Sequence, residues 1–166
     1  MSMSSSASMN ALQPLFRVKG MNLRVGLTNV VQDLAFEVFP GEMVAILGKN
    51  GVGKSTLLAN LAGLPRGEMF GSVLLHEKTY AAWGARAAAC WRGWMGQKQQ
   101  DQFSATVLET VLSGRHPHLS RWALESAEDY ALAMASLAAV GMGTFAERDV
   151  LTLSGGERQR VAMATI

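Results

Sequence analysis

The chain has 166 residues, which is enough for one domain with its own hydrophobic core. Hydrophobic residues make up 49% of the sequence and charged residues 17%, a composition typical of a globular protein and not of a disordered one. The formal net charge is +2, from 15 Lys and Arg against 13 Asp and Glu. This balance predicts a mixed solvated surface and offers no electrostatic case for nucleic acid, so we expect no nucleic-acid partner.

Three local features narrow the class further. Residues 1–10 are rich in Ser, Met and Ala and lack the basic and apolar regions of a signal peptide, so we expect residues 1–12 to be a disordered tail. The longest apolar stretch, residues 131–140, is too short to cross a membrane. The single cysteine, Cys90, excludes an internal disulfide and fits a reducing compartment, and its Ala-rich surroundings predict a buried structural thiol.

The start of the chain has the pattern of β-structure. Residues 15–18 and 34–39 are predicted strands, and in the second Phe36 and Val38 face the side opposite to Glu37. Residues 43–47 (MVAIL) form a continuous apolar run between a Pro-Gly turn and a glycine. This run predicts a strand buried on both faces, as in a parallel sheet.

Helices and short strands alternate in the middle of the chain. Residues 53–62 predict a helix that ends before Gly63, and residues 72–75 predict a short strand. Residues 85–91 predict a helical turn that leads to a strand near residues 94–95.

The last third is predicted to be mainly helical. Residues 106–113 form one helix capped by Thr106, and residues 126–140 form a second. Ser154 is predicted to cap a final helix that still continues at the last residue.

A glycine-rich loop predicts a phosphate site between a strand and a helix. Residues 48–55 (GKNGVGKS) match the pattern G-x-x-x-x-G-K-[ST]. The glycines allow successive N–H groups to point at phosphate oxygens, and the helix adds its N-terminal partial charge. Lys54 would neutralise the β- and γ-phosphates, and Ser55 would ligate Mg²⁺. The predicted phosphate-binding residues are Gly48, Asn50, Gly51, Gly53, Lys54, Ser55 and Thr56.

Residues 153–160 (LSGGERQR) predict a second anion site at a helix N-terminus. Ser154 offers a hydroxyl, Gly155 and Gly156 allow a phosphate to approach the backbone, and first-turn N–H groups point outward. An ordinary serine-capped helix would explain Ser154 and one glycine, but not the whole octet. We expect Arg158 and Arg160 to face solvent or to stabilise the local fold.

These two motifs resemble the Walker A loop and the signature of ABC-transporter ATPases. In that family the signature binds the γ-phosphate of ATP held by the Walker A loop of the opposite subunit. The resemblance implies a head-to-tail homodimer with ATP and Mg²⁺ as cofactors. It also implies an α/β P-loop NTPase core with an N-terminal antiparallel β subdomain and a helical subdomain. The expected partial domain, residues 13–166, divides into a core (13–97), a helical subdomain with the signature (about 98–153) and the start of a return to the core (154–166).

Other residues resemble further parts of the family. Gln97 matches the Q-loop glutamine that senses Mg²⁺ and the attacking water, which implies a catalytic role beside Lys54. Gln97 lies among other glutamines, however, and a plain loop residue stays an alternative. Residues 103–118 (FSATVLETVLSGRHPH) resemble importers of iron–siderophore complexes, haem or cobalamin. In this resemblance His116 and His118 have a structural or surface role.

The resemblance also implies partners and a location. Residues 97–117, from Gln97 to Pro117, correspond to the region where the family docks the membrane-spanning permease subunits. A periplasmic binding protein takes part indirectly. The expected location is the cytoplasmic face of the inner membrane, with the chain bound peripherally.

The sequence departs from the family at two places. Where the family stacks adenine on an aromatic ring, residues 23–28 offer Val25 or Leu27, which predicts a weaker apolar contact. The Walker B Asp and Glu, the D-loop and the switch histidine would follow Ile166. We therefore expect a truncated subunit with an incomplete sheet, residues 43–47 on an unpaired edge and at best very poor ATPase activity alone.

Three functions are compatible with these patterns. The first is ATP binding, and in the complete protein ATP hydrolysis, that powers an importer of iron complexes, haem or cobalamin. The second is a non-catalytic nucleotide-binding or regulatory module that ends naturally at Ile166. The third, a soluble ABC ATPase of translation or DNA repair, predicts a second cassette or a long inserted arm. The residues GRHPH favour a transporter.

Overall fold

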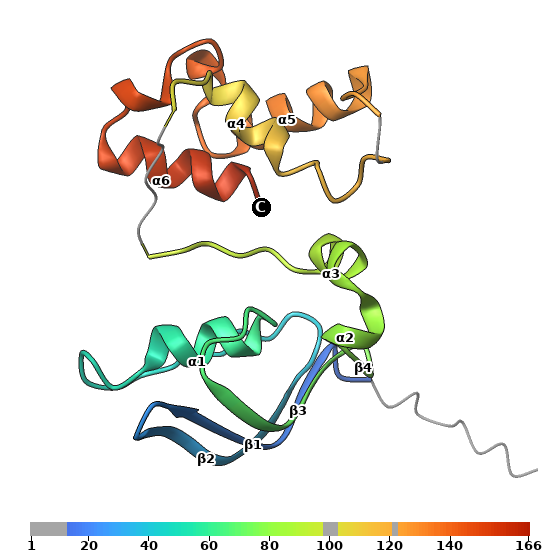
Figure 1. The fold of residues 1–166 in the computed structure, drawn as a ribbon. Coiled ribbons are helices and arrows are strands. Elements are labelled where there is room, and N and C mark those ends of the chain that lie inside the picture. Colours follow the sequence, from blue (N-terminus) through green and yellow to red (C-terminus); the bar gives the residue numbers. More distant parts are fainter. Residues whose placement is uncertain (1–12, 98–102, 121–122) are drawn as a thin grey trace, which may run out of the picture. The chain divides into compact units, whose positions relative to one another are not determined.

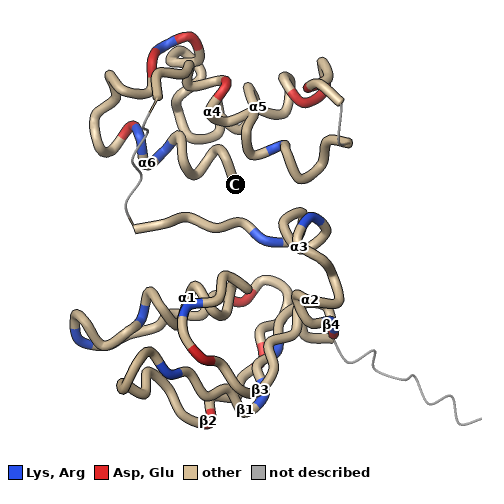
Figure 2. The backbone as a smooth tube through the Cα atoms, viewed as in Figure 1, with Lys and Arg blue, Asp and Glu red and all other residues tan. Residues whose placement is uncertain are grey.

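The computed structural model describes residues 13–97, 103–120 and 123–166 (Figure 1). Contacts divide the chain into two compact units, with the boundary between Gly84 and Ala85. The tail predicted at residues 1–12 and the glutamines that follow residue 97 up to residue 102 lie outside the described residues. Basic and acidic positions are interspersed along both units (Figure 2).

A four-stranded antiparallel sheet forms the first unit, in the order β2-β1-β3-β4. Strand β1 spans Phe16–Val25, β2 Thr28–Val38, β3 Glu68–Leu75 and β4 Lys78–Thr79. The predicted strands at residues 15–18 and 34–39 overlap the longer strands β1 and β2 except at residues 15 and 39, and the prediction at residues 72–75 is the end of β3. β1 and β2 are joined by a tight hairpin, because Val25 pairs with Thr28 and the intervening Gly26 has a φ of 57°.

Two glycines allow the central strands to approach closely where β1 is irregular. The pairing of β1 with β3 shifts between Lys19 and Asn22. At this point a Cβ on Gly71 would lie 2.4 Å from the carbonyl oxygen of Gly20, which is too short for any side chain. Both residues also have positive φ, which glycine adopts without strain.

Helix α1, Lys54–Leu61, packs on this sheet and completes the first core. Leu57 and Leu61 of α1 join buried residues of β1 and β3, among them Met21 and Val73. The helix ends as predicted, since Gly63 has a φ of 69° just after its last turn. Short α2, Tyr80–Trp83, follows β4, and the Tyr80 hydroxyl donates to the carbonyl of Leu61 at 3.0 Å.

Two predicted strands do not form in the described part of the chain. Residues 43–47 and 94–95 belong to no strand, and Met43 and Leu47 are 95% and 90% exposed. The apolar pattern of residues 43–47 predicts burial on both faces, but a strand exists only where another strand accepts its backbone hydrogen bonds. No described segment pairs with either run, so both remain irregular.

Helices form the second unit. These are α3 (Ala85–Trp91), α4 (Val107–Ser113), α5 (Ala127–Ala139) and α6 (Gly155–Ala164), with 3₁₀ turns η1 (Gly143–Phe145) and η2 (Val150–Thr152). The helices predicted from residues 85, 106, 126 and 154 are thus confirmed. The core shared by α4, α5 and α6 includes Val107, Leu137 and Met142, each completely buried. Gly114 allows the end of α4 to approach α6, because a Cβ there would lie 2.0 Å from the carbonyl of Thr165.

Side-chain caps begin α4, α5 and α6 in the same way. Thr106, Ser126 and Ser154 each accept a hydrogen bond from the amide three residues later, and the acidic residue at that position accepts one from the cap's amide. This reciprocal capping box satisfies two backbone donors that a helix cannot pair internally. The caps therefore determine where each helix begins.

Within the described ranges, no helix has both the length and the apolar character needed to cross a membrane.

Asp129 is the buried carboxylate of the second unit and predicts sensitivity to acid. It accepts hydrogen bonds from Arg115 at 2.8 Å and from the amide and hydroxyl of Ser126. The Arg115 hydrogen bond, together with those from Ser126, lowers the pKa of Asp129 from 3.8 to about 2. A lowered folded-state pKa stabilises the fold above the unfolded-state value, and this contribution is lost as pH falls through the folded-state value.

We therefore predict that the unfolding free energy falls between about pH 4 and pH 2, and that Asp129→Asn makes this fall shallower. The pKa values of Glu109, Asp149 and Glu157 are also lowered, so the variant reduces the fall without abolishing it. Urea denaturation at several pH values measures the slope. An equal slope in the variant and the wild type would contradict the assignment.

Candidate functional site

The loop before α1 has the geometry of a phosphate cradle. Gly51 and Gly53 have φ values of 81° and 100°, in the left-handed region that favours glycine. A Cβ on Gly53 would also lie 2.7 Å from Cγ1 of Val30, so this glycine is required both by its backbone and by its neighbour. The loop is closed by a bond from the amide of Val52 to the carbonyl of Lys49 at 3.4 Å.

Lys54 lies across the loop that precedes it. Its Nζ donates to the carbonyl oxygens of Gly48 and Lys49, each at 2.8 Å. A lysine ammonium has three donors and a full positive charge, so the loop holds a cation at its mouth. Asn50 and Ser55 are exposed beside it, and Thr56 is half-buried in the first turn of α1.

The first turn of α1 differs from those of α4, α5 and α6. In the described chain no side chain caps α1, and its first turn has no acidic residue. The amides of this turn therefore have a partial positive charge that no carboxylate of the turn offsets. Together with Lys54, they form a donor set that fits the phosphates of a nucleotide.

The residues also fit a phosphate-bound Mg²⁺. Of the two predicted Mg²⁺ ligands, Ser55 lies in the first unit, and its hydroxyl is on an exposed residue. Among the described residues, no group of three His, Cys, Asp or Glu side chains is arranged to hold a metal ion. A Mg²⁺ ion that keeps several waters and binds phosphate oxygens needs few protein ligands, and the exposed Ser55 hydroxyl would supply one.

The second predicted site, at the start of α6, is already engaged in its own capping box. The Ser154 hydroxyl donates to Oε2 of Glu157 at 2.7 Å, and the Ser154 amide donates to the same oxygen at 2.8 Å. These bonds from Ser154, with nearby Arg148 and Arg160, lower the pKa of Glu157. A phosphate at this helix start would therefore compete with the Glu157 carboxylate for the Ser154 donors.

Glycines at the start of α6 are open to solvent. An added Cβ on Gly155 or Gly156 would meet nothing within 4 Å among the described residues. A side chain at either position would therefore cause no steric clash within the unit. The neighbouring arginines stabilise the local fold: Arg158 Nη2 donates to the carbonyl of Val150 at 3.2 Å, and Arg160 Nε contacts Sδ of Met142 at 3.4 Å.

The remaining predicted residues lie apart from these two groups in the chain. Gln97 is exposed and lies in a bend that follows the irregular residues 92–96. It is the last described residue before residue 103. Val25 ends β1 with 42% of its surface exposed, and Leu27 in the hairpin is 93% exposed. The loop before α1 belongs to the first unit, and Gln97 and the start of α6 belong to the second.

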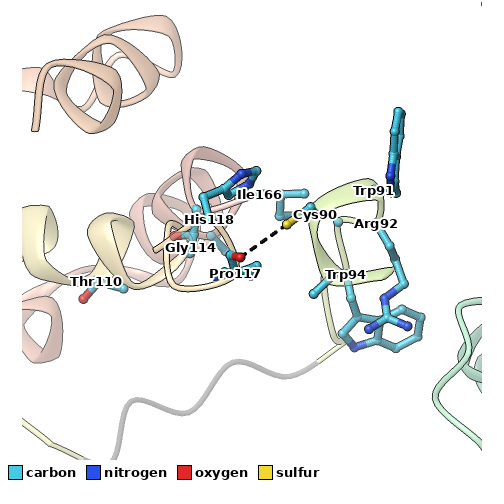
Figure 3. A pocket seen from close by; sticks show the side chains of 13 residues that line it. Cys90, Trp91, Arg92, Trp94, Thr110, Gly114, Pro117, His118 and Ile166 are labelled. Atoms are coloured by element: carbon cyan, nitrogen blue, oxygen red, sulfur yellow. Dashed lines mark hydrogen bonds between the residues drawn. The ribbon is translucent and has the colours of Figure 1, made fainter. Parts of the chain in front are cut away.

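Cys90 is exposed, so the predicted burial of this thiol is wrong. The Ala-rich run around it forms α3, of which Ala88 is the only buried residue. The thiol contacts the carbonyl of Pro117 at 3.4 Å, at the edge of a pocket of about 420 Å³ (Figure 3). Trp94, Thr110 and Ile166 also line this pocket. A short helix with an apolar sequence buries only the face that packs against other elements. Ala88 lies on that face of α3, whereas Cys90 lies at the edge of the pocket.

Sequence reasoning missed two carboxylates of the second unit. Glu157 fixes the backbone within the predicted signature by accepting a bond from the Ser154 amide, and Asp149 fixes the backbone just before it through a bond from the Leu151 amide at 2.7 Å. The signal for Glu157 is the spacing Ser-x-x-Glu, which is the sequence pattern of a capping box. Asp149 has no comparable pattern, because one of its partners, Ser104, is far away in the sequence.

A loop with the pattern G-x-x-x-x-G-K-[ST], a lysine across it and a helix start without a side-chain cap among the described residues are typical of P-loop nucleotide-binding proteins, although the strand expected before the loop does not form here. Residues 31–166 match the model of the family described as ABC transporter. The chain belongs to this family. Its fold is that of the family's ATPase domain, with an antiparallel sheet and a set of helices and without a closed sheet. ATP is the nucleotide that this family binds.

Several curated proteins resemble the chain. It is 41% identical over 152 residues to the hemin import ATP-binding protein HmuV of Gloeobacter violaceus. The alignment covers 92% of this chain and 54% of that protein. The chain is 42% identical to the protein of the same name from Deinococcus radiodurans, over 94% of this chain and 58% of that one. The petrobactin import ATP-binding protein FpuD of Bacillus anthracis is 36% identical, over 92% of this chain and 56% of that protein.

Solved structures give the same fold. An inward-facing ABC transporter assigned to the metal-chelate type superposes with a TM-score of 0.75 at 30% identity, over 92% of this chain and 54% of that one. The protein cbiO1 of Clostridium perfringens, part of the ABC transporter complex cbiONQ, superposes with a TM-score of 0.71 at 27% identity, over 92% and 60%. The chain spans about half the length of the curated relatives it matches.

The glycines of the two sites are predicted to respond differently to substitution. Gly53→Ala should lower the unfolding free energy by about 1–3 kcal/mol, because it combines a left-handed backbone with a clash against Val30. Gly51→Ala should cost about 1–2 kcal/mol from backbone strain alone. Gly155→Ala is the matched control in an open helical position and should change stability by less than about 1 kcal/mol. Urea denaturation measures all three, and a Gly53→Ala protein as stable as the Gly155→Ala protein would refute the steric account.

Proposed function

We propose that this chain is the ATP-binding part of an ABC importer that carries iron complexes, haem or cobalamin. The observation that carries the proposal is the helix start at α1, where Lys54 lies across a glycine loop and no side chain of the described residues caps the first turn. This donor set suits a triphosphate. The cargo class is supported by relatives whose names describe import of hemin or petrobactin.

Each predicted residue has a role in this proposal. The amides from Gly48 to Thr56 and the Lys54 ammonium bind the phosphates, and the Ser55 hydroxyl takes one position on Mg²⁺. Gln97 would have the role that the family resemblance gives it, sensing Mg²⁺ and the attacking water. Val25 gives adenine a weak apolar contact in place of an aromatic ring. Polyphosphate recognition would therefore contribute more to affinity than base recognition.

The start of α6 would act on ATP held by a second copy of the chain. Ser154, Gly155 and Gly156 would approach the γ-phosphate bound at the partner's loop, which makes the working unit a head-to-tail homodimer. The exposed glycines support this role, because they leave room for an approaching phosphate. ATP would then hold the two copies together, and hydrolysis in the whole protein would separate them.

The permease-docking segment, defined as residues 97–117, would contact the membrane-spanning subunits. Such a contact positions the chain at the cytoplasmic face of the inner membrane as a peripheral subunit. A periplasmic binding protein would then influence the chain only through the permease. The names of relatives, which describe import ATP-binding proteins, support a role in import.

Lys54 provides the test of the nucleotide site. We predict that Lys54→Ala weakens binding of Mg²⁺-ATP about 10- to 100-fold, because a hydrogen bond to a charged group is lost. Lys49→Ala is the matched control, since only the main-chain carbonyl of Lys49 takes part in the loop contacts described above. Isothermal titration calorimetry of both variants and the wild type measures the affinities. Equal affinities for Lys54→Ala and Lys49→Ala would overturn the proposal.

A further inference from the structure

We propose that Ser104 and Asp149 form a clamp that positions the start of α6 from the segment before α4. One oxygen of the Asp149 carboxylate, Oδ2, accepts a hydrogen bond from the Ser104 hydroxyl. The other, Oδ1, accepts one from the Leu151 amide at 2.7 Å. A single side chain thus joins two segments that lie 45 positions apart in the sequence.

The backbones of the two segments are paired around this carboxylate. Thr106 and Asp149 form an antiparallel bridge. The amide of Val150 donates to the carbonyl of Ala105 at 3.0 Å, and the amide of Val107 donates to the carbonyl of Arg148 at 2.9 Å. Movement of residues 104–107 would therefore be passed directly to residues 148–150.

A chain of short contacts continues from Asp149 to the helix start. The Thr152 hydroxyl donates to the carbonyl of Asp149 at 2.7 Å, which closes the turn η2. Arg148 holds the same threonine, since its Nε donates to the Thr152 hydroxyl at 3.0 Å. Leu153 follows with 7% of its surface exposed, and Ser154 then caps α6. The position of Ser154 is thus set by the turn that Asp149 holds.

The first residue of η2 is also held from α6. Arg158 Nη2 donates to the carbonyl of Val150 at 3.2 Å, and Val150 is buried in the core of the unit. The start of the turn is therefore held both from the segment before α4 and from α6. Loss of the Ser104 hydroxyl would remove one restraint on Asp149 and loosen this turn, while the backbone bonds between the two segments and the core stay in place.

Asp149 and Ser104 act through other residues, so both are positioning residues. Ser104 lies in the permease-docking segment, and the clamp would pass a displacement of that segment to Ser154 and Gly156. This consequence for transport rests on the proposed function. The clamp itself is independent of nucleotide binding and can be tested without nucleotide.

Hydrogen exchange of the full chain tests the clamp. We expect Ser104→Ala to speed exchange of the Leu151, Ser154 and Glu157 amides about threefold to tenfold, the range expected for loss of one hydrogen bond. Ser104 bonds to none of these amides, so the effect must pass through Asp149. Amides of Ala133 and Leu137 in α5 should keep their wild-type rates, which separates positioning from general loss of stability.

Three variants complete the experiment. Ser104→Thr keeps the hydroxyl and should restore wild-type exchange. Ser113→Ala is the matched control, because this serine donates to Thr110 at the other end of α4. In an Asp149→Ala background, Ser104→Ala should have no further effect, because the pair acts as one unit. Wild-type exchange at Leu151–Glu157 in Ser104→Ala, or an equal increase in α5, would overturn the clamp. Neither result depends on whether Lys54 binds ATP.

Discussion

The amides at the starts of the helices are the constraint on which this structure depends. A helix leaves its first N–H groups without internal partners, so each start needs a side chain, a solvent molecule or a ligand. In the second unit Thr106, Ser126 and Ser154 fill this need with capping boxes. Helix α1 begins instead at Gly53, with no side-chain cap among the described residues. Helix α1, which follows the phosphate loop, thus lacks the capping box that α4, α5 and α6 have.

The start of α6 has its own capping box and is also the proposed second phosphate site, and this combination would have a chemical consequence. Glu157 satisfies the Ser154 donors, so the helix is stable without a ligand. An approaching phosphate would have to take those donors from a carboxylate of the same charge. Such competition weakens anion binding by a single copy and favours binding when a partner brings the phosphate already held by its own loop. In the proposed dimer the phosphate is held first at α1.

Local patterns predicted the helices, whereas the strands depended on distant partners. Caps and stop residues such as Thr106 and Gly63 lie next to the helices they limit, so they can be read from neighbouring sequence. The apolar run at residues 43–47 specifies burial but supplies no hydrogen-bond partner, and it forms no strand in the described chain. Ser104 and Asp149 could not be paired from sequence, because the antiparallel bridge at Thr106 creates their contact. The left-handed glycines of the loop and the helix that follows it could be predicted because they are consecutive in the sequence, but the strand expected before the loop could not.

The central claim is that each copy of the chain contributes half of a shared ATP site, and cross-linking between distinguishable copies tests it most directly. An isotopically heavy Lys54→Ala chain is mixed with a light wild-type chain and an ATP analogue with a photoreactive group on its γ-phosphate. The account predicts that the heavy chain is labelled within residues 154–158 only when the light chain is present. Equal labelling of the heavy chain alone, or labelling confined to residues 48–56 of the light chain, would contradict it.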